Sequence, residues 1–512
     1  MIKAIIAEDK PPILRNIKSK LEVIDPELKI VGVAGDGEEA LMLTKELKPN
    51  IVFTDIRMPV MDGLQLITEA KKLDDSIIFV IISGYDEFEY ARKAMKLGVS
   101  EYLLKPVAKE ILADTVSRII SDLKLKKHNY EKECIADIIS FSKTNKQISD
   151  YYFEYNYFYI ACINIGPYSD FAISYSNPFN SFWSSIDLDF IVKGCLQNNG
   201  RYWIVDGRNL TEQVIVFAQS GQTEINYKHA AELVFDSLAS LNIQVNMIVG
   251  KKMRTVMDIG FEVQFLRALM RKNIIFGKSN MFFSEQLSIS NSDKNNILGA
   301  LLENKLAAFI LRNQKKLFFN ELQTLFASWE VNKYTQYTIE KLLKQIDWLC
   351  RKSLVNQQIP SNDSELEIDE MLSTSENYYI LFSNSEFIFS QYFFDNNLDE
   401  KSSLKDNINR IENFIRTHYS EQISVNYIAD MFNLDVSYLS RTFKSLKGVS
   451  PMELIVSLRM ERAKELLLSD PNLTIKDVAE VVGYSDQFYF SRIFKIITGV
   501  SPSIYKKSVH DI

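Results

Sequence analysis

The chain has 512 residues, of which 46% are hydrophobic and 24% charged, and its formal net charge is -7. This length exceeds what a single hydrophobic core supports, so we expect three or four domains, each with enough apolar residues for a normal interior. Residues 401–512 hold 15 basic and 13 acidic residues, so nucleic-acid binding there would rely on where arginine and lysine are placed rather than on bulk positive charge.

Cysteine usage and hydropathy narrow the class further. The four cysteines are scattered without CxxC spacing, which argues against a zinc site and a disulfide framework. The apolar run at the start is too short for a signal peptide, and no later run is long and apolar enough to span a bilayer. We therefore expect a soluble cytoplasmic protein that does not contact a membrane.

Short apolar runs recur about every 25 residues at the start of the chain, with helical patterns between them. This alternation predicts a doubly wound parallel sheet in an α/β domain of the flavodoxin-like class, over residues 1–122. The expected strands are Lys3–Ala7, Ile30–Ala34, Ile51–Thr54, Ile77–Ile82 and Tyr102–Leu104.

Polar and charged side chains follow four of these strands. Glu8 and Asp9 follow the first strand, Asp55 the third, Ser83 the fourth and Lys105 the fifth. Ligands bind at the carboxyl ends of such strands, so these residues should converge. Carboxylate oxygens suit a hard cation such as Mg²⁺, and a metal beside Asp55 would offset the charge of an incoming phosphoryl group, with the lysine opposite.

The segment Asp55-Ile-Arg-Met-Pro-Val-Met-Asp-Gly63, with Glu8-Asp9 before it and Lys105-Pro106 after it, closely resembles the receiver domain of bacterial two-component response regulators. The resemblance implies that Asp55 accepts a phosphoryl group and that Lys105 contacts this group. It also implies that the peptide bond between Lys105 and Pro106 is cis. It also implies a sensor histidine kinase as partner.

The same resemblance implies a magnesium site and a switch. Asp9, Asp55 and the carbonyl group of Arg57 would bind Mg²⁺, with Glu8 acting through water. Ser83 and Tyr102 match the switch pair of the family. Lys10 stands where many relatives carry a third acidic residue, so the expected metal affinity is lower than with an acidic residue there.

Residues 123–403 carry weaker signals. We expect a helical linker over 123–150, an α+β domain over 151–290 and a helical region over 291–395. The spacing of Leu112, Val116, Ile119 and Leu123 fits equally well a short coiled coil or packing on the first sheet. The expected strands are Tyr157–Asn164, Tyr202–Val205, Val214–Ala218 and Gln244–Val249, with a hairpin turn at Asp206–Asn209.

The stretch from Met247 to Gly250 and the helical pattern after it faintly resemble the C-terminal half of cyclase-like domains. The metal-binding carboxylates of an active nucleotidyl cyclase are absent. A dimerising or sensory spacer is therefore the expected role of this part of the chain.

A repeat with a constant offset of 51 residues lies near the C-terminus. Tyr438–Lys444 and Tyr489–Lys495 have almost the same sequence, and each is followed by Gly-Val-Ser-Pro, ending at Pro451 and Pro502. Such a repeat predicts one supersecondary unit used twice. Each copy would end in a short helix that buries two apolar residues, Leu439 and Phe443 in the first and Phe490 and Phe494 in the second, and exposes serine, arginine and lysine.

Exposed cations at matched positions indicate contact with DNA. Arg441 and Arg492 can bond guanine bidentately, whereas Lys444 and Lys495, later in each helix, suit phosphates. A helix over Leu404–Tyr419 precedes the first unit, and an amphipathic helix between the units would hold them at a fixed distance.

Residues 404–508 resemble the AraC-type DNA-binding domain, an all-α fold with two helix-turn-helix units, including the Gly-Tyr-Ser of residues 483–485. Phe488 is hydrophobic where relatives often carry a polar residue, so the second helix would contact thymine methyl groups or add mainly affinity. The expected DNA-binding residues are Ser437, Tyr438, Ser440, Arg441 and Lys444 in the first unit and Gln487, Phe488, Tyr489, Ser491, Arg492 and Lys495 in the second.

Together these patterns predict a phosphorylation-dependent transcription regulator, with promoter DNA, a sensor histidine kinase and a second copy of the chain as partners. RNA polymerase is a further candidate partner. Two alternatives remain at this point. One is an enzyme whose middle domain is the regulated output, and the other is a scaffold; in both, DNA binding would only localise the protein.

Overall fold

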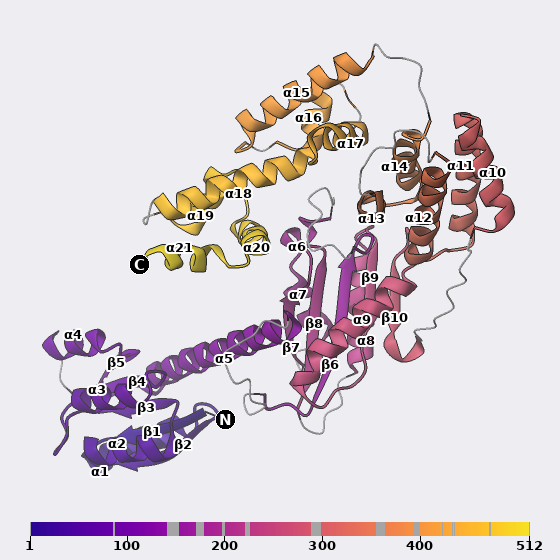
Figure 1. The fold of residues 1–512 in the computed structure, drawn as a ribbon. Coiled ribbons are helices and arrows are strands. Elements are labelled where there is room, and N and C mark those ends of the chain that lie inside the picture. The colour runs from indigo at the N-terminus through magenta and orange to yellow at the C-terminus, as the bar shows by residue number, and fades with distance from the viewer. Residues whose placement is uncertain are drawn as a thin grey trace. The chain divides into compact units, whose positions relative to one another are not determined.

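The computed structural model of the chain describes residues 2–510, except for residues 85–87, 141–152, 170–178, 197–199, 221–225, 288–297, 355–363, 394–399, 422, 433, 435 and 470–472. It divides into two compact units, Met1–Tyr130 and Glu131–Ile512. The boundary between them lies within helix α5 (Lys109–Ser140). Figure 1 labels the elements, and each unit is described by itself.

The first unit contains a five-stranded, fully parallel sheet with the strand order β2-β1-β3-β4-β5. Helices alternate with the strands along the chain, which confirms the predicted doubly wound sheet. The strands are β1 (Ile2–Ala7), β2 (Leu28–Ala34), β3 (Ile51–Thr54), β4 (Ile78–Ser83) and β5 (Glu101–Leu104). The helices before α5 are α1 (Pro11–Leu21), α2 (Gly37–Leu47), α3 (Gly63–Leu73) and α4 (Phe88–Lys96).

Separate apolar clusters cover the two faces of this sheet, because successive strand side chains point to opposite faces. Ala4 and Ile6 of β1 pack with α1 and α5, whereas Ile5 packs with α2 and α3. Leu112 and Val116 of α5 are fully buried in the first of these clusters. The α5 residues whose spacing fitted two alternatives therefore pack on the sheet, and the coiled-coil alternative is wrong for them.

The second unit begins with a mixed sheet of order β10-β9-β6-β8-β7. β6 pairs antiparallel with β8 and β9, β7 pairs antiparallel with β8, and β10 runs parallel to β9. The four predicted strands and the hairpin between β7 and β8 are confirmed. The strands are β6 (Tyr157–Ile165), β7 (Arg201–Asp206), β8 (Glu212–Gln219), β9 (Val245–Val249) and β10 (Asn280–Phe283).

Helices cover both faces of this mixed sheet. Leu188 and Val192 of α7, together with Val234 of α8, join a cluster with alternate residues of β6, while α9 contacts β6 and β9. The helices are α6 (Phe182–Ser185), α7 (Leu188–Cys195), α8 (Tyr227–Ala239) and α9 (Ile259–Asn273), and short 3-10 turns cover Val256–Asp258 and Ser284–Gln286.

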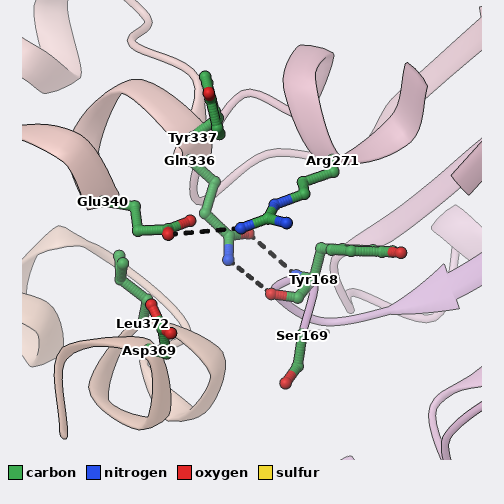
Figure 2. Close-up of a pocket in the computed structure, with 8 residues that line it drawn as sticks. All are labelled: Tyr168, Ser169, Arg271, Gln336, Tyr337, Glu340, Asp369 and Leu372. Atoms are coloured by element: carbon green, nitrogen blue, oxygen red, sulfur yellow. Dashed lines mark hydrogen bonds and ion pairs between the residues drawn. The ribbon is translucent and has the colours of Figure 1, made fainter. Parts of the chain in front are cut away.

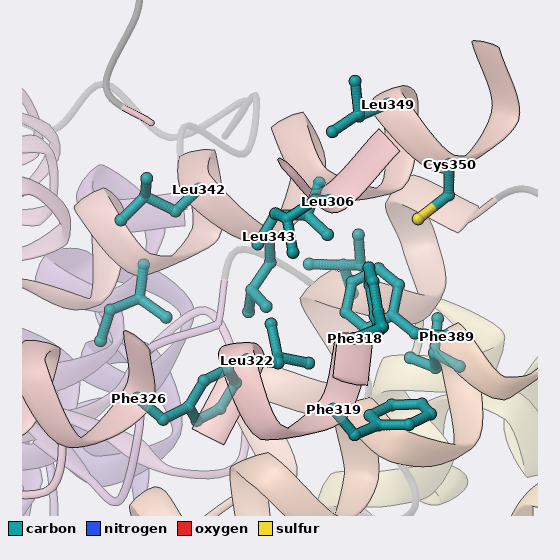
Figure 3. Packing of buried hydrophobic residues seen from close by; sticks show 14 of the residues in the cluster. Leu306, Phe318, Phe319, Leu322, Phe326, Leu342, Leu343, Leu349, Cys350 and Phe389 are labelled. Carbon is teal, nitrogen blue, oxygen red and sulfur yellow. The ribbon is translucent and has the colours of Figure 1, made fainter. Parts of the chain in front are cut away.

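Five helices follow and share one aromatic-rich core. Figure 3 shows part of it, where Phe318 and Phe319 of α11 lie near Phe389 of α14. The helices are α10 (Ala300–Leu311), α11 (Lys315–Val331), α12 (Gln336–Ser353), α13 (Ser364–Thr374) and α14 (Tyr378–Ser390). Across the part of the chain that the structure describes, no helix combines the length and the apolar character needed to cross a membrane.

The last seven helices form two small cores that share helix α18. Ile455 of α18 packs with the helices before it, and Met460 and Leu467 pack with the helices after it. The predicted helix before the first unit is present and begins four residues earlier, at Glu400. The helices are α15 (Glu400–His418), α16 (Val425–Met431), α17 (Val436–Lys447), α18 (Pro451–Ser469), α19 (Ile475–Val481), α20 (Gln487–Thr498) and α21 (Pro502–His510).

Candidate phosphoacceptor site and nucleic-acid interface

Three of the predicted site residues meet at the carboxyl edge of the parallel sheet. The Nζ atom of Lys105 lies 2.5 Å from Oδ2 of Asp55 and 2.5 Å from Oε2 of Glu8. Both carboxylates are buried, with 6% of Asp55 and 2% of Glu8 exposed. The structure thus places a lysine between two acidic side chains that come from different strand ends.

The backbone around Asp55 is fixed by hydrogen bonds and by a glycine. Its amide donates to the Ala7 carbonyl at 2.9 Å, and the Ile56 amide donates to its Oδ1 at 2.6 Å. A Cβ atom on Gly63 would lie only 2.1 Å from the Asp55 carbonyl oxygen, so only glycine lets α3 begin this close to Asp55. Gly63 is part of the sequence motif around Asp55, but no pattern in the sequence predicted that it allows this close approach.

The acidic cluster fits a magnesium ion. Ligand oxygens of Glu8, Asp9 and Asp55 lie within 4.8 Å of one another. Oδ1 of Asp9 is buried and accepts no hydrogen bond within the described part of the chain, as expected for an oxygen reserved for a cation. The side chain of Arg57 instead donates to the Tyr90 hydroxyl at 3.2 Å, and the metal-binding role of its carbonyl group stays a prediction.

Burial dominates the electrostatics of Glu8. It raises the pKa of this carboxyl group, and the neighbouring charge of Asp55 raises it further, while Lys105 lowers it. A cation at the cluster would favour the ionised form of Glu8, and the lysine supplies part of that stabilisation.

Ser83 and Tyr102, the predicted switch pair, lie on the neighbouring strands β4 and β5. Ser83 is fully buried at the end of β4, where its carbonyl accepts from the Lys105 amide at 2.8 Å. Tyr102 is partly buried and packs against the apolar cluster on the α2 and α3 face. The Lys105–Pro106 bond is cis, as the resemblance implied.

Removing the positive charge of Lys105 should destabilise the first unit. We expect Lys105→Met to cost about 3 to 5 kcal/mol at neutral pH, because two buried carboxylates lose their counter-charge. The pKa of Glu8 would then rise further above its unfolded value. Stability that depends on such a raised pKa is present at low pH and is lost as pH rises, so the defect should shrink towards about pH 4.

Hydrogen exchange of β1 and β3 amides in EDTA, at neutral and acidic pH, measures this effect. Lys72→Met is the matched control, because Lys72 is exposed and pairs only at the surface with Glu69, at 2.6 Å. A Lys105→Met defect of equal size at both pH values would contradict the electrostatic explanation.

The C-terminal helices form two helix-turn-helix units, α16–α17 and α19–α20. The side chain of Ser424 caps α16 by accepting from the Tyr427 amide, and Thr474 caps α19 in a reciprocal box with Asp477. In the second unit Gly483 has φ +94°, and a Cβ atom there would lie 2.7 Å from the Ser420 carbonyl oxygen. That turn therefore requires glycine.

The second helix of each unit, α17 and α20, is called a recognition helix below. The predicted apolar residues Leu439, Phe443, Phe490 and Phe494 are all fully buried. On the other face, 83% of Phe488 is exposed, Lys495 is also exposed, and Gln487 and Ser491 are partly exposed. Tyr489 packs against the core, and burial raises its pKa. Tyr438 and Ser440 are partly exposed, and the Ser437 side chain lies outside the described residues.

Three of the four predicted DNA-contacting cations are held by contacts with the middle of the chain, whereas Lys495 is exposed. Arg441 donates to the Ser383 carbonyl at 3.0 Å, and Lys444 pairs with Glu370. Arg492 donates to the Asn209 carbonyl at 3.1 Å, and only 17% of its side chain is exposed. Sequence patterns predicted exposed arginines at both positions, and these contacts with the middle of the chain explain the difference.

Arg459 is a further structural residue that the sequence did not reveal. It is buried in α18, where it donates to the Tyr419 carbonyl at 2.6 Å and the Glu421 carbonyl at 2.7 Å. Its guanidinium group also lies over the Tyr484 ring, and burial lowers its pKa. Arg459 thereby joins the end of α15 to the turn of the second unit.

Figure 2 shows a small cavity among α9, α12, α13 and the segment after β6. Gln336 exchanges two hydrogen bonds with the backbone of Tyr168, and Arg271 pairs with Glu340 at 3.5 Å. The volume is about 30 Å³, enough for one or two water molecules. This cavity is therefore too small for a nucleotide substrate.

Comparisons with known proteins match both ends of the chain. The family model of the response regulator receiver domain matches residues 4–117, and a helix-turn-helix domain matches residues 428–508. A solved structure, the REC domain of the response regulator AraT from Geobacillus stearothermophilus, is 36% identical, covering 25% of this chain and 98% of that one with a TM-score of 0.23.

Two curated relatives are transcriptional regulatory proteins by name. The uncharacterized YesN of Bacillus subtilis is 39% identical over 124 residues, 24% of this chain and 34% of that protein. HptR of Staphylococcus aureus is 36% identical over 123 residues, 24% of this chain and 48% of that protein. The matches thus span between a third and a half of these relatives. The chain thus contains an N-terminal response regulator receiver domain and a C-terminal helix-turn-helix domain of the AraC type.

Proposed function

We propose that this protein is a transcription regulator whose binding to promoter DNA depends on phosphorylation of Asp55 by a sensor histidine kinase. The observation that carries the proposal is the presence, in one chain, of a buried carboxylate–lysine cluster and two helix-turn-helix units of matched sequence. The family likewise points to a regulator rather than an enzyme.

Phosphoryl transfer would take place at the cluster of Glu8, Asp55 and Lys105. An Asp55 carboxylate oxygen attacks phosphorus, the bond between phosphorus and the kinase histidine nitrogen breaks, and that nitrogen keeps the electron pair. Glu8, Asp9 and Asp55 would hold Mg²⁺, which supplies positive charge near the phosphoryl oxygens. Lys105 already touches Asp55, so it would pair with the phosphoryl group once the carboxylate has become an acyl phosphate.

The output would be DNA binding in the cytoplasm. The two recognition helices would enter successive major grooves, with Arg441 and Arg492 at base edges and the lysines at phosphates. Ser83 and Tyr102 would respond to the phosphoryl group and change the surface near them. This change would favour a homodimer on paired sites if it stabilises the dimer more than the monomer. RNA polymerase is a further candidate partner of such a dimer.

Base reading by Arg441 tests this proposal directly. DNA sites are first selected from a random pool by the full chain. We then expect Arg441→Ala to lower the ratio of specific to random DNA affinity by about 1 to 3 kcal/mol, relaxing the preference at one base pair. Lys444→Ala should weaken both affinities alike. The ratio is the informative quantity, because any change in the free protein cancels from it.

Arg462→Ala serves as the control. It removes the same charge from the exposed face of α18, where Arg462 pairs with Glu465 at 2.8 Å, so its ratio should stay unchanged. Failure of the full chain to enrich any sequence, or an unchanged ratio for Arg441→Ala, would count against DNA reading by this helix.

A further inference from the structure

Both recognition helices are held by the middle of the chain, within the same compact unit. In the first, Arg441 donates to the Ser383 carbonyl at 3.0 Å, near the centre of α14. One turn later Lys444 pairs with the carboxylate of Glu370 on α13, and both side chains are partly buried. Two cations on the expected DNA face are thus satisfied by other groups of the protein.

The second recognition helix repeats the pattern with different partners. Nη2 of Arg492 donates to the carbonyl groups of Asn209 and Glu212 at 3.1 and 3.3 Å and lies 3.5 Å from a carboxylate oxygen of Asp206. These three acceptors belong to the β7–β8 hairpin itself, at the end of β7, in the turn and at the start of β8. Leu210, at the tip of that hairpin, is 2% exposed because it packs into the apolar cluster of the second helix-turn-helix unit.

We propose that the middle region is an intramolecular inhibitor that occupies the DNA-binding face in the closed protein. This inference rests on the proposed DNA-binding function. The geometry supports it because a guanidinium that donates to protein carbonyls cannot offer the same hydrogens to guanine. Asp206 and Glu370 also present carboxylates to cations that would otherwise meet DNA, so the closed contact competes with DNA for the same groups.

The strength of the contact suits a reversible device. The ion pairs are partly exposed, and each such pair shifts an equilibrium by only about 2- to 5-fold. Leu210 adds an apolar contact whose removal should have a larger effect than either pair. The closed form is therefore stabilised enough to lower DNA affinity, yet a phosphorylated dimer bound at two sites could still overcome it.

Variants in the middle region test the inference without touching the DNA face. We expect Glu370→Gln in the unphosphorylated full chain to tighten binding of selected and random DNA alike by about 2- to 5-fold. Adding Leu210→Ser should bring the gain to roughly 10-fold or more, since it also removes an apolar contact. Glu376→Gln is the matched control for the change in net charge, because this exposed glutamate lies six residues away in the turn before α14.

A second readout does not require DNA. Acetylation of lysines by a small reagent, followed by mass spectrometry, should find Lys444 protected in the wild type and more reactive in Glu370→Gln. The exposed Lys495 provides the internal reference. Unchanged DNA affinity together with unchanged Lys444 reactivity would overturn the inhibitory contact. Increased Lys444 reactivity with no DNA binding by any of the proteins would instead overturn the proposed function, and the inhibitory role with it.

Discussion

Asp55→Asn should abolish Mg²⁺-dependent phosphorylation of the full chain by acetyl phosphate. In this reaction an Asp55 oxygen attacks phosphorus and acetate leaves, forming an acyl phosphate. The asparagine amide is too weak a nucleophile for this step and would remove one anionic ligand from the proposed Mg²⁺ site. The neighbouring lysine remains, so the charge environment changes only at the reacting group. Intact-mass measurement of the protein quantifies the label, and EDTA present during the reaction should prevent labelling of the wild type as well.

Asp36→Asn is a suitable control for this experiment. Asp36 also follows a strand of the same sheet, but its side chain caps α2 by accepting from the Glu39 amide at 2.9 Å. Asparagine caps helices about as well as aspartate, so folding and labelling should both be preserved. Label that persists in Asp55→Asn at the wild-type level would place the phosphoacceptor elsewhere.

The cluster of Glu8, Asp55 and Lys105 was predictable because the topology of a parallel sheet determines where these residues lie. Once a parallel sheet is inferred, residues that follow its strands must lie along one edge, and Glu8, Asp55 and Lys105 do meet there. The role of Gly63 was less accessible. It depends on a close approach between the start of α3 and the Asp55 carbonyl, and an approach of that kind leaves no periodic signal in the sequence.

The C-terminal fold was also predictable from a regular pattern in the sequence. The buried positions Leu439 and Phe443 follow helical periodicity, and the repeat fixes where the second copy lies. The burial of Arg459 was not predicted, because an arginine on an amphipathic helix is ordinarily a surface residue. Here two backbone carbonyls and the Tyr484 ring compensate its burial.

The contacts of the recognition helices with the middle region could not be predicted. Glu370 and Asp206 lie more than 70 residues before Lys444 and Arg492, and no pattern in the sequence pairs them. Backbone carbonyl acceptors, such as that of Ser383, are independent of side-chain identity. Sequence patterns predict which groups would bind DNA, whereas the contacts of these groups with the middle region depend on tertiary packing.

Inserting 5 base pairs between the two half-elements of one monomer site should abolish simultaneous protection of both. The reason lies in α18, whose residues contribute to the cores of both helix-turn-helix units, with Arg459 joining them further. Recognition helices held in this way would fit consecutive major grooves about 34 Å apart, and about 5 base pairs turn the second groove to the opposite side of the duplex.

The expected loss is large. Releasing one half-element removes several base contacts worth about 1 to 3 kcal/mol each, so affinity should fall roughly 100-fold or more. Footprinting measures which half-element stays protected, and the same 5 base pairs inserted just outside the site should leave binding intact. Undiminished protection of both half-elements after the internal insertion would show that α18 does not hold the two helices rigidly. The helix-turn-helix units would then bind DNA independently, and half-element spacing would play no part in site selection.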